Sequence, residues 1–149
     1  MNKKTLFSGT FDPFTIGHYE LIKRALCFTD EIVIAIGINS GKKNFYSLED
    51  RITNIKNIFA HETRVNVTSY NSLTVDFAKS INVDFILRGI RNTNDLEYEK
   101  NMADINRKLS GIDTVFLFSE PEYCYISSSL VRELITHNKD ISNLIPKIT

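Results

Sequence analysis

The sequence predicts an α/β fold, a doubly wound, five-stranded parallel sheet in the order 3-2-1-4-5 with helices on both faces. Five short runs are rich in β-branched and aromatic residues, and the segments between them have the character of helices. Parallel strands need long crossover connections, and helices supply them. The 149 residues contain no linker-like or low-complexity stretch, so we predict one domain, residues 1–149.

The predicted strands are the runs TLFS, EIVIAIGI, RVNVTSY, VDFILR and TVFLF, at residues 5–8, 31–38, 64–70, 83–88 and 114–118. Helices are predicted from Thr15 onward and at residues 47–60, 74–81, 94–109 and 130–137. In the helix at 47–60, apolar residues recur every three or four positions, and Ser47 and Asp50 are spaced like a capping box. Asn94 and Glu97 indicate the cap of the helix at 94–109.

The composition excludes several classes of protein. Eighteen basic and eighteen acidic residues give zero formal net charge, so nothing global indicates a nucleic-acid or membrane partner. The longest apolar run, residues 32–36, is far shorter than the ~20 residues of a membrane span, and no apolar signal-peptide region is evident. We therefore expect a cytoplasmic protein. Cys27 and Cys124 match no metal or redox spacing and are predicted to be small buried or half-buried residues.

Two polar loops follow the strands that the predicted order places side by side. Ligands of such sheets bind where the strand order reverses, here between the first and fourth strands, which the loops GTFDPFTIGH and RGIRNTND follow. Gly9 permits close approach of a ligand, and Thr15 is a good N-cap for a helix whose third residue is His18. Such a helix start favours a phosphate. The helix dipole would keep His18 neutral and a bound phosphate would charge it, so the sequence leaves both states open.

The second of these loops and two further segments at this edge carry candidate phosphate contacts. Arg88 and Arg91 stand around Gly89, and an arginine at the end of a buried strand suits bidentate phosphate binding, with a surface ion pair as the alternative. Lys42, in NSGKKNF, is either a solvated surface charge or a cation that swings over a phosphate. The serines at 127–129 precede the last helix, where one would serve as the N-cap and all three suggest a second anion-binding helix start.

Motifs of several other enzyme classes are missing from the sequence. It contains no GxGxxG, GxxxxGK[ST], GxSxG or HExxH. His61 and His137 have no partner at metal-binding spacing and are predicted to be surface residues. We therefore expect no metal site formed by the protein and no covalent nucleophile.

The motifs GTFDPFTIGH, RGIRNTNDLEYE and ISSSLVRE, in this order, closely resemble those of the phosphopantetheine adenylyltransferase family of nucleotidyltransferases. The resemblance covers nearly the whole chain. It implies a Rossmann-like fold and transfer of the adenylyl group of ATP to 4′-phosphopantetheine, which gives dephospho-coenzyme A and pyrophosphate with Mg²⁺ as cofactor. It also implies a homohexamer and feedback by coenzyme A.

The resemblance assigns roles to individual residues. Catalytic donors are His18, Lys42, Arg91 and Ser129. The acceptor, 4′-phosphopantetheine, would contact Thr10, Lys42, Thr74 and Arg88. ATP would contact Thr10, Phe11, His18, Gly89, Ile90, Arg91, Glu99, Tyr123, Cys124, Tyr125, Ile126, Ser127, Ser128 and Ser129.

The chemistry of the reaction agrees with the missing nucleophile. A phosphomonoester that attacks the α-phosphorus of ATP is already ionised near neutral pH, so no general base is required. Direct in-line attack then depends on positioning and on donors aimed at the developing charge. Two alternatives are a sister nucleotidyltransferase that acts on nicotinamide mononucleotide or glycerol 3-phosphate, and a non-catalytic nucleotide-binding protein of the same fold.

Overall fold

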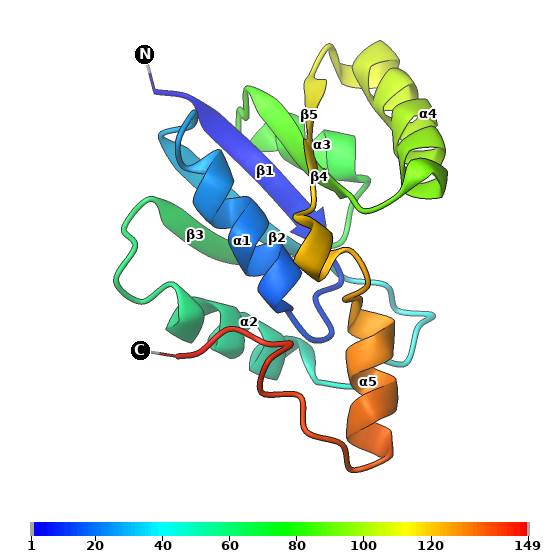
Figure 1. The fold of residues 1–149 in the computed structure, drawn as a ribbon. Coiled ribbons are helices and arrows are strands. Elements are labelled where there is room, and N and C mark those ends of the chain that lie inside the picture. Colours follow the sequence, from blue (N-terminus) through cyan, green and yellow to red (C-terminus); the bar gives the residue numbers. More distant parts are fainter. Residues whose placement is uncertain (1, 149) are drawn as a thin grey trace.

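The computed structural model describes residues 2–148, so the two ends of the predicted domain lie outside the described residues. Within them, five parallel strands form one sheet in the order β3-β2-β1-β4-β5 (Figure 1). The strands are β1 Lys4–Gly9, β2 Glu31–Gly37, β3 Val65–Tyr70, β4 Phe85–Ile90 and β5 Asp113–Phe118. Each predicted strand is present, and the predicted order is confirmed.

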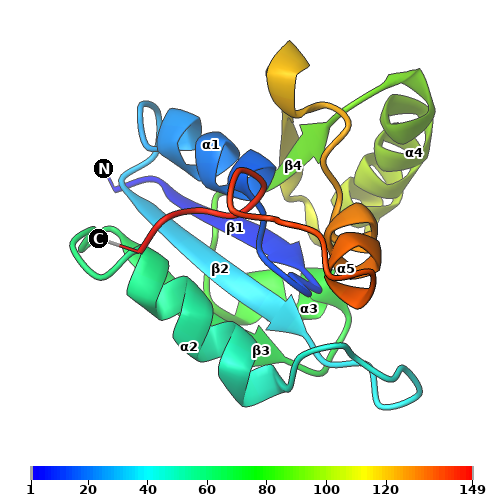
Figure 2. The ribbon, with the colours of Figure 1, turned by 60° about the horizontal axis from the view of Figure 1, so that its bottom comes forward.

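The helices of residues 2–148 cover both faces of the sheet, as predicted. They are α1 Ile16–Ala25, α2 Leu48–Ile58, α3 Thr74–Ser80, α4 Thr93–Ser110 and α5 Ser128–Thr136, with a short 3-10 turn, η1 Pro121–Tyr123, before α5. Figures 1 and 2 show α1 and α2 on one face and α3 and α4 on the other, with α5 beyond the carboxyl ends of the strands.

The core has two layers because successive strand residues point to opposite faces of the sheet. Phe7 of β1 and Ile34 of β2 belong to the cluster that α1 and α2 cover. Their neighbours Leu6 and Val33 belong to the opposite cluster, together with Val75 of α3. Both faces of the central strands are therefore removed from water, which explains why β2 is an unbroken apolar run in the sequence.

The central pair of strands, β1 and β4, is joined differently from the rest of the sheet. β1 pairs with β2 over six residue pairs. Within the described residues its pairing with β4 stops after Thr5–Phe85 and Leu6–Ile86. Further along, Nη1 of Arg88 donates to the carbonyl oxygen of Ser8 at 2.8 Å. A side chain thus links the two strands where their backbone pairing has ended.

The cap of α4 corrects one prediction. The N-cap is Asn92, whose side-chain oxygen accepts the N–H of Asp95 at 2.9 Å, and α4 begins at Thr93. The predicted cap, Asn94, therefore lies inside the helix. Asn92 and Asp95 have the same spacing as Asn94 and Glu97, so the spacing alone did not identify the cap. The predicted cap of α2 is correct, because the Ser47 hydroxyl accepts the N–H of Asp50 at 3.0 Å.

Exposure tests the remaining sequence predictions. Cys27 is exposed in the turn after α1, so the prediction that it is buried or half-buried was wrong, whereas Cys124 is half-buried as predicted. His61 and His137 are exposed, as predicted. Between residues 2 and 148, no helix combines the length and the apolar character that crossing a membrane requires.

The segment after α5 returns to the start of α1. Figure 2 shows this segment, in red, running from α5 across α1 toward α2. The N–H of Ile16 donates to the carbonyl oxygen of Leu144 at 2.9 Å. Because Ile16 is the first residue of α1, this bond satisfies one of the N–H groups that a helix start leaves without an intrahelical partner.

Candidate active site

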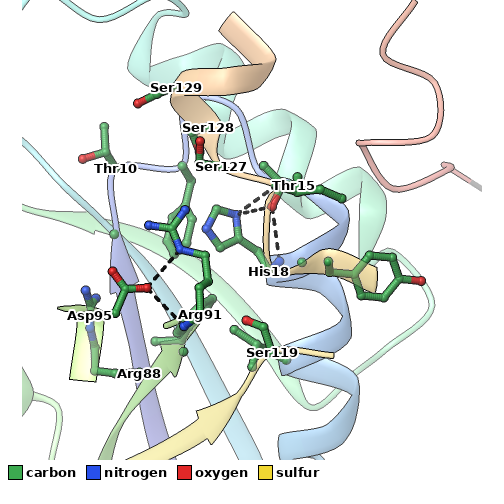
Figure 3. Close-up of a pocket in the computed structure, with 18 of the residues that line it drawn as sticks. Thr10, Thr15, His18, Arg88, Arg91, Asp95, Ser119, Ser127, Ser128 and Ser129 are labelled. Atoms are coloured by element: carbon green, nitrogen blue, oxygen red, sulfur yellow. Dashed lines mark hydrogen bonds and ion pairs between the residues drawn. The ribbon is translucent and has the colours of Figure 1, made fainter. Parts of the chain in front are cut away.

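A cavity of about 320 Å³, the central cavity, lies at the carboxyl ends of β1 and β4 and reaches the starts of α1 and α5. This is the place where the reversal of strand order predicted a ligand site. Most of the predicted site residues line it, namely Thr10, Phe11, His18, Arg88, Gly89, Arg91, Glu99, Tyr123, Ile126, Ser127, Ser128 and Ser129. Figure 3 shows several of these side chains directed into the same space.

Five predicted site residues do not line the central cavity. The Ile90 side chain is buried, and Cys124 is half-buried with its Sγ against the backbone of residues 119 and 120. Tyr125 is 66% exposed. Lys42 is exposed in the loop after β2. Thr74, the first residue of α3, lines a different cavity.

His18 is held at the start of α1 by Thr15, as the sequence predicted. The Thr15 hydroxyl accepts the N–H of His18 at 3.3 Å, and Nδ1 of His18 accepts the N–H of Thr15 at 2.9 Å. The two bonds form a capping box with histidine in the place of the usual glutamate or glutamine. Because Nδ1 accepts a hydrogen bond, the neutral ring carries its proton on Nε2. His18 therefore offers an N–H donor to the cavity.

The surroundings of the ring keep His18 uncharged in the free protein. It packs against the rings of Phe7, Phe11 and Phe14, with centroids 5.1 to 6.0 Å away. This burial, followed by the positive charges of Arg88 and Arg91, lowers the pKa of His18 from 6.5 to about 3. Of the two states that the sequence left open, the structure without ligand selects the neutral one.

Gly9 has a structural use in addition to the predicted one. It lines the central cavity, but a Cβ there would lie 2.9 Å from the ring of Phe11. Phe11 has a positive φ of 50°, and its ring packs against Phe7 and Phe14. Gly9 is thus explained by the close approach of a neighbouring aromatic ring, which the sequence did not show.

Most of the N–H donors of Arg88 bond to acceptors of the protein itself. Its Nε and Nη2 donate to the two carboxylate oxygens of Glu99 at 2.9 and 2.8 Å, and Nη1 donates to Ser8 O. Although burial opposes the charged form, the hydrogen bonds and charge of Glu99 raise the pKa of Arg88 above its usual value. A guanidinium has five N–H donors, so after these three bonds one remains on each Nη. Because Arg88 lines the central cavity, these two donors are available to a phosphate oxygen there.

Arg91 follows β4 and is less constrained. Its Nε and its backbone N–H both donate to Oδ2 of Asp95 at 3.1 Å (Figure 3). The pair is exposed, with 40% of the Arg91 side chain open to solvent. Such a pair contributes little to stability, so an anionic ligand can compete with Asp95 for the guanidinium.

The three serines before α5 have separate tasks. Ser127 is the N-cap, since its hydroxyl accepts the N–H of Leu130 at 3.1 Å. Ser128 donates to the carbonyl oxygen of Pro13 at 2.8 Å, and Ser129 accepts from Arg132 at 3.1 Å. The first N–H groups of α5 lie on the central cavity beside these hydroxyls and favour an anion there.

Sequence reasoning missed three polar residues of the central cavity, Ser8, Asp95 and Ser119. Asp95 is four residues after Arg91 on a helix start, a spacing that can reveal such a pair. Ser119 follows β5 at the same edge of the sheet as the other loops, and its N–H donates to Ile90 O at 2.8 Å. Only the position after a strand could have indicated Ser119.

A second cavity, the α3–α4 cavity, adjoins the first. Its volume is about 290 Å³, and it shares Ser8, Arg88 and Glu99 with the central cavity. Apolar side chains of α3 and α4 form most of its remaining wall, with a few polar groups that include Thr74. The Thr74 hydroxyl is fixed by a 2.8 Å hydrogen bond with Tyr70. The two cavities therefore meet at Arg88.

The carboxylates of the central cavity are engaged with arginines. Across residues 2–148, no three His, Cys, Asp or Glu side chains form a group that could hold a metal ion. The two acidic residues of the central cavity, Asp95 and Glu99, are each paired with an arginine.

Comparison with known proteins identifies the family. Residues 6–134 match the cytidylyltransferase-like family. Over 145 residues the chain is 54% identical to the phosphopantetheine adenylyltransferase of Bacteroides thetaiotaomicron, covering 97% of this chain and 96% of that one. The chain belongs to the phosphopantetheine adenylyltransferase family. The protein of that name from Bacteroides fragilis is 52% identical, with 97% of each chain covered.

Solved structures share the fold at lower identity. A bifunctional NMN adenylyltransferase/ADP ribose pyrophosphatase from Francisella tularensis has a TM-score of 0.74 at 15% identity, covering all of this chain and 46% of that one. The chain thus spans less than half the length of that protein. A lipopolysaccharide core biosynthesis protein from Thermoplasma volcanium has a TM-score of 0.58 at 19% identity, covering 79% and 96%. The phosphopantetheine adenylyltransferase family that the three motifs indicated is confirmed by the curated relatives.

The pKa of His18 predicts a pH dependence of stability. Because the folded-state pKa is about 3 and the unfolded value 6.5, the unfolded chain binds the proton between these values. Stability is therefore unaffected above pH 6.5 and is lost as the pH falls through this window. His18→Gln keeps an acceptor at the third helix position but does not titrate. Between pH 6.5 and 5 we expect the wild type to lose ~2 kcal/mol more unfolding free energy than the variant in urea titrations. Parallel losses in both proteins would contradict a neutral His18.

Proposed function

We propose that the protein transfers the adenylyl group of ATP to 4′-phosphopantetheine, which gives dephospho-coenzyme A and pyrophosphate. The proposal rests chiefly on one observation. Hydrogen-bond donors from α1, β4 and α5 meet in the central cavity, which adjoins the more apolar α3–α4 cavity. A triphosphate and a long, partly apolar phosphomonoester need such a pair of sites. The names of relatives about half identical over nearly the whole chain support the same activity.

The triphosphate of ATP would occupy the central cavity. Arg91, the first N–H groups of α5 and the hydroxyl of Ser129 supply donors there. Helix starts and arginines favour phosphate oxygens for electrostatic reasons. The exposed pair of Arg91 with Asp95 leaves the guanidinium able to change partner.

The acceptor would enter through the α3–α4 cavity. Its phosphate would lie near Arg88, where the two cavities meet, and Thr10 lines the adjoining part of the central cavity. The pantetheine chain would then lie between α3 and α4, whose apolar side chains and few polar groups match a chain of methylene and amide groups. Thr74 stands on this path.

The transfer itself needs no group to accept a proton. An oxygen of the acceptor phosphate attacks the α-phosphorus of ATP, and the bond from that phosphorus to the pyrophosphate oxygen breaks. The Nε2 proton of neutral His18 is available to donate to the α-phosphoryl oxygens as their charge changes. Lys42 would approach from the loop after β2, which borders the same edge of the sheet (Figure 2). Mg²⁺, held by the phosphates of ATP, would neutralise part of their charge.

The assembly, regulation and location expected from the resemblance remain proposals. We propose a homohexamer, feedback by coenzyme A at the same cavities, and a cytoplasmic protein. Exposed apolar side chains on α4 support self-association, since Tyr98, Ile105 and Leu109 are 63%, 51% and 59% exposed. Light scattering of the purified protein should give about six times the mass of 17.1 kDa, and a monomer would exclude the hexamer.

The activity is tested with the pure protein, Mg²⁺, ATP and 4′-phosphopantetheine. We expect pyrophosphate and dephospho-coenzyme A in equal amounts. His18→Ala removes one donor aimed at the reacting phosphate, so its kcat should fall on the order of a hundredfold or more while ATP binding is largely kept. Product from nicotinamide mononucleotide but not from 4′-phosphopantetheine would refute the proposal. Equal losses of ATP binding and rate would instead assign His18 to ground-state binding.

The acceptor path is tested by filling the α3–α4 cavity. Ala103 lines it, so Ala103→Trp should raise the KM for 4′-phosphopantetheine at least about tenfold and leave the KM for ATP nearly unchanged. Asn101→Trp is the matched control, because Asn101 is exposed on α4 and lines neither cavity. An unchanged KM for the acceptor in Ala103→Trp would place the acceptor elsewhere.

A further inference from the structure

The carboxylate of Asp12 joins the turn after β1 to the loop after β2. Asp12 is 2% exposed. Its Oδ2 accepts the N–H of Phe45 at 2.7 Å, and its Oδ1 accepts the N–H of Tyr46 at 2.8 Å. Hydrogen bonds to a charged acceptor in a buried place are strong and have few competitors. Asp12 thus fixes the end of the loop that carries Lys42.

Arg51 joins the same two segments from the other side. It is 4% exposed and projects from α2. Its Nη1 donates to Thr10 O at 2.9 Å, while Nε lies 3.2 Å from Tyr46 O and 3.3 Å from Ser47 O. The turn is also tied to α5, because Arg132 Nη1 donates to Asp12 O at 2.8 Å. These bonds form one connected network. It joins the loop after β2 and α5 to the turn after β1, residues 10–15, which we call the phosphate-binding turn after its proposed role.

The other end of the loop is held by the N–H of Ile38, which donates to Tyr70 O at 2.7 Å, and between the two ends the N–H groups of Gly41 and Lys42 bond only locally, to Asn39. Residues 38–43 are exposed, and Lys42 stands three residues before Phe45. A tether of three residues allows a reach of ~10 Å from the fixed point. Lys42 can therefore move toward a ligand, but only within a region that the Asp12 contacts limit from one end of the loop and the Ile38–Tyr70 bond from the other.

We propose that Asp12 and Arg51 are positioning residues for adenylyl transfer, which act by anchoring the loop of Lys42 to the phosphate-binding turn. The inference rests on the proposed function, in which Lys42 contacts the reacting phosphates. Neither Asp12 nor Arg51 lines the central cavity, so they act through the loop rather than on the substrates. If the contacts of Asp12 or Arg51 are lost, Lys42 would occupy a wider range of positions. Even a small misplacement of a catalytic group lowers the reaction rate strongly.

A double-mutant cycle tests the anchor. Asp12→Asn keeps the shape of the side chain but replaces one oxygen by NH₂, which cannot accept the N–H of Phe45 or Tyr46. In the wild type, Lys42→Ala should lower kcat/KM on the order of a hundredfold. In the Asp12→Asn background the same change should cost at least about fivefold less, because Lys42 is no longer held in place. The KM for ATP should change little in Asp12→Asn, and the loss should fall on kcat.

The controls separate positioning from general destabilisation. Asp84 also accepts a backbone N–H, that of Lys4 at 2.8 Å, but at the amino ends of the strands. Asp84→Asn should leave the cost of Lys42→Ala unchanged. Arg51→Lys keeps the charge but loses the fork of donors, and it should reproduce the effect of Asp12→Asn should that variant fold poorly. Amide exchange should speed up at Phe45 and Tyr46 in Asp12→Asn and stay slow in the central strands.

The outcomes distinguish the anchor from the activity. An equal cost of Lys42→Ala in both backgrounds, in a wild type that turns over, would overturn the anchor alone. A harmless Lys42→Ala would also overturn it, because there would be no catalytic lysine to position. A wild type without adenylyl transfer would overturn the proposed function and this inference with it.

Discussion

The parallel contact between β1 and β4 is the constraint on which the candidate site depends. Parallel strands end at the same edge of a sheet, so pairing Leu6 with Ile86 brings together two polar loops from distant parts of the sequence. The pairing also ends early, and the Arg88 side chain takes over the link through Ser8 O. A continuous ladder would place backbone against backbone at the point where the central and α3–α4 cavities meet. The candidate site is therefore located where the backbone pairing of β1 with β4 has ended.

The charges of the site are nearly balanced before any ligand binds. Arg88 is paired with Glu99 and Arg91 with Asp95, while His18 is neutral. Each carboxylate balances the charge of its guanidinium and orients it without using all of its N–H donors. A polyanionic substrate then competes with carboxylates for donors that are already oriented. Such preorganisation fits a reaction in which stabilisation of charge does the chemical work.

Local sequence patterns predicted the fold and the helix start of the site. Features that depend on contacts between distant residues could not be predicted from such patterns. The strands and the Thr15–His18 pair depend on residues that are close in sequence, so the sequence alone was enough to predict them. The partner of Arg88, eleven residues away on another element, and the ring that requires Gly9 depend on packing. Lys42 was predicted as a site residue, yet the structure leaves it exposed on its loop. A contact between Lys42 and a ligand in the central cavity would require the loop to move, and a residue pattern does not encode such movement.

The hydrogen bond from Ile16 to Leu144 joins two residues that are synthesised at different times. The turn after β1 is synthesised more than a hundred residues before its partners Ser128, Arg132 and Leu144. At translation rates of ~5–20 residues per second, the turn waits several seconds for them. The nascent chain can assemble its strands one after another during that time. The contacts of the turn after β1 are complete only when Leu144 has been made, so a chain interrupted between β5 and that residue would carry the five strands without all of these contacts.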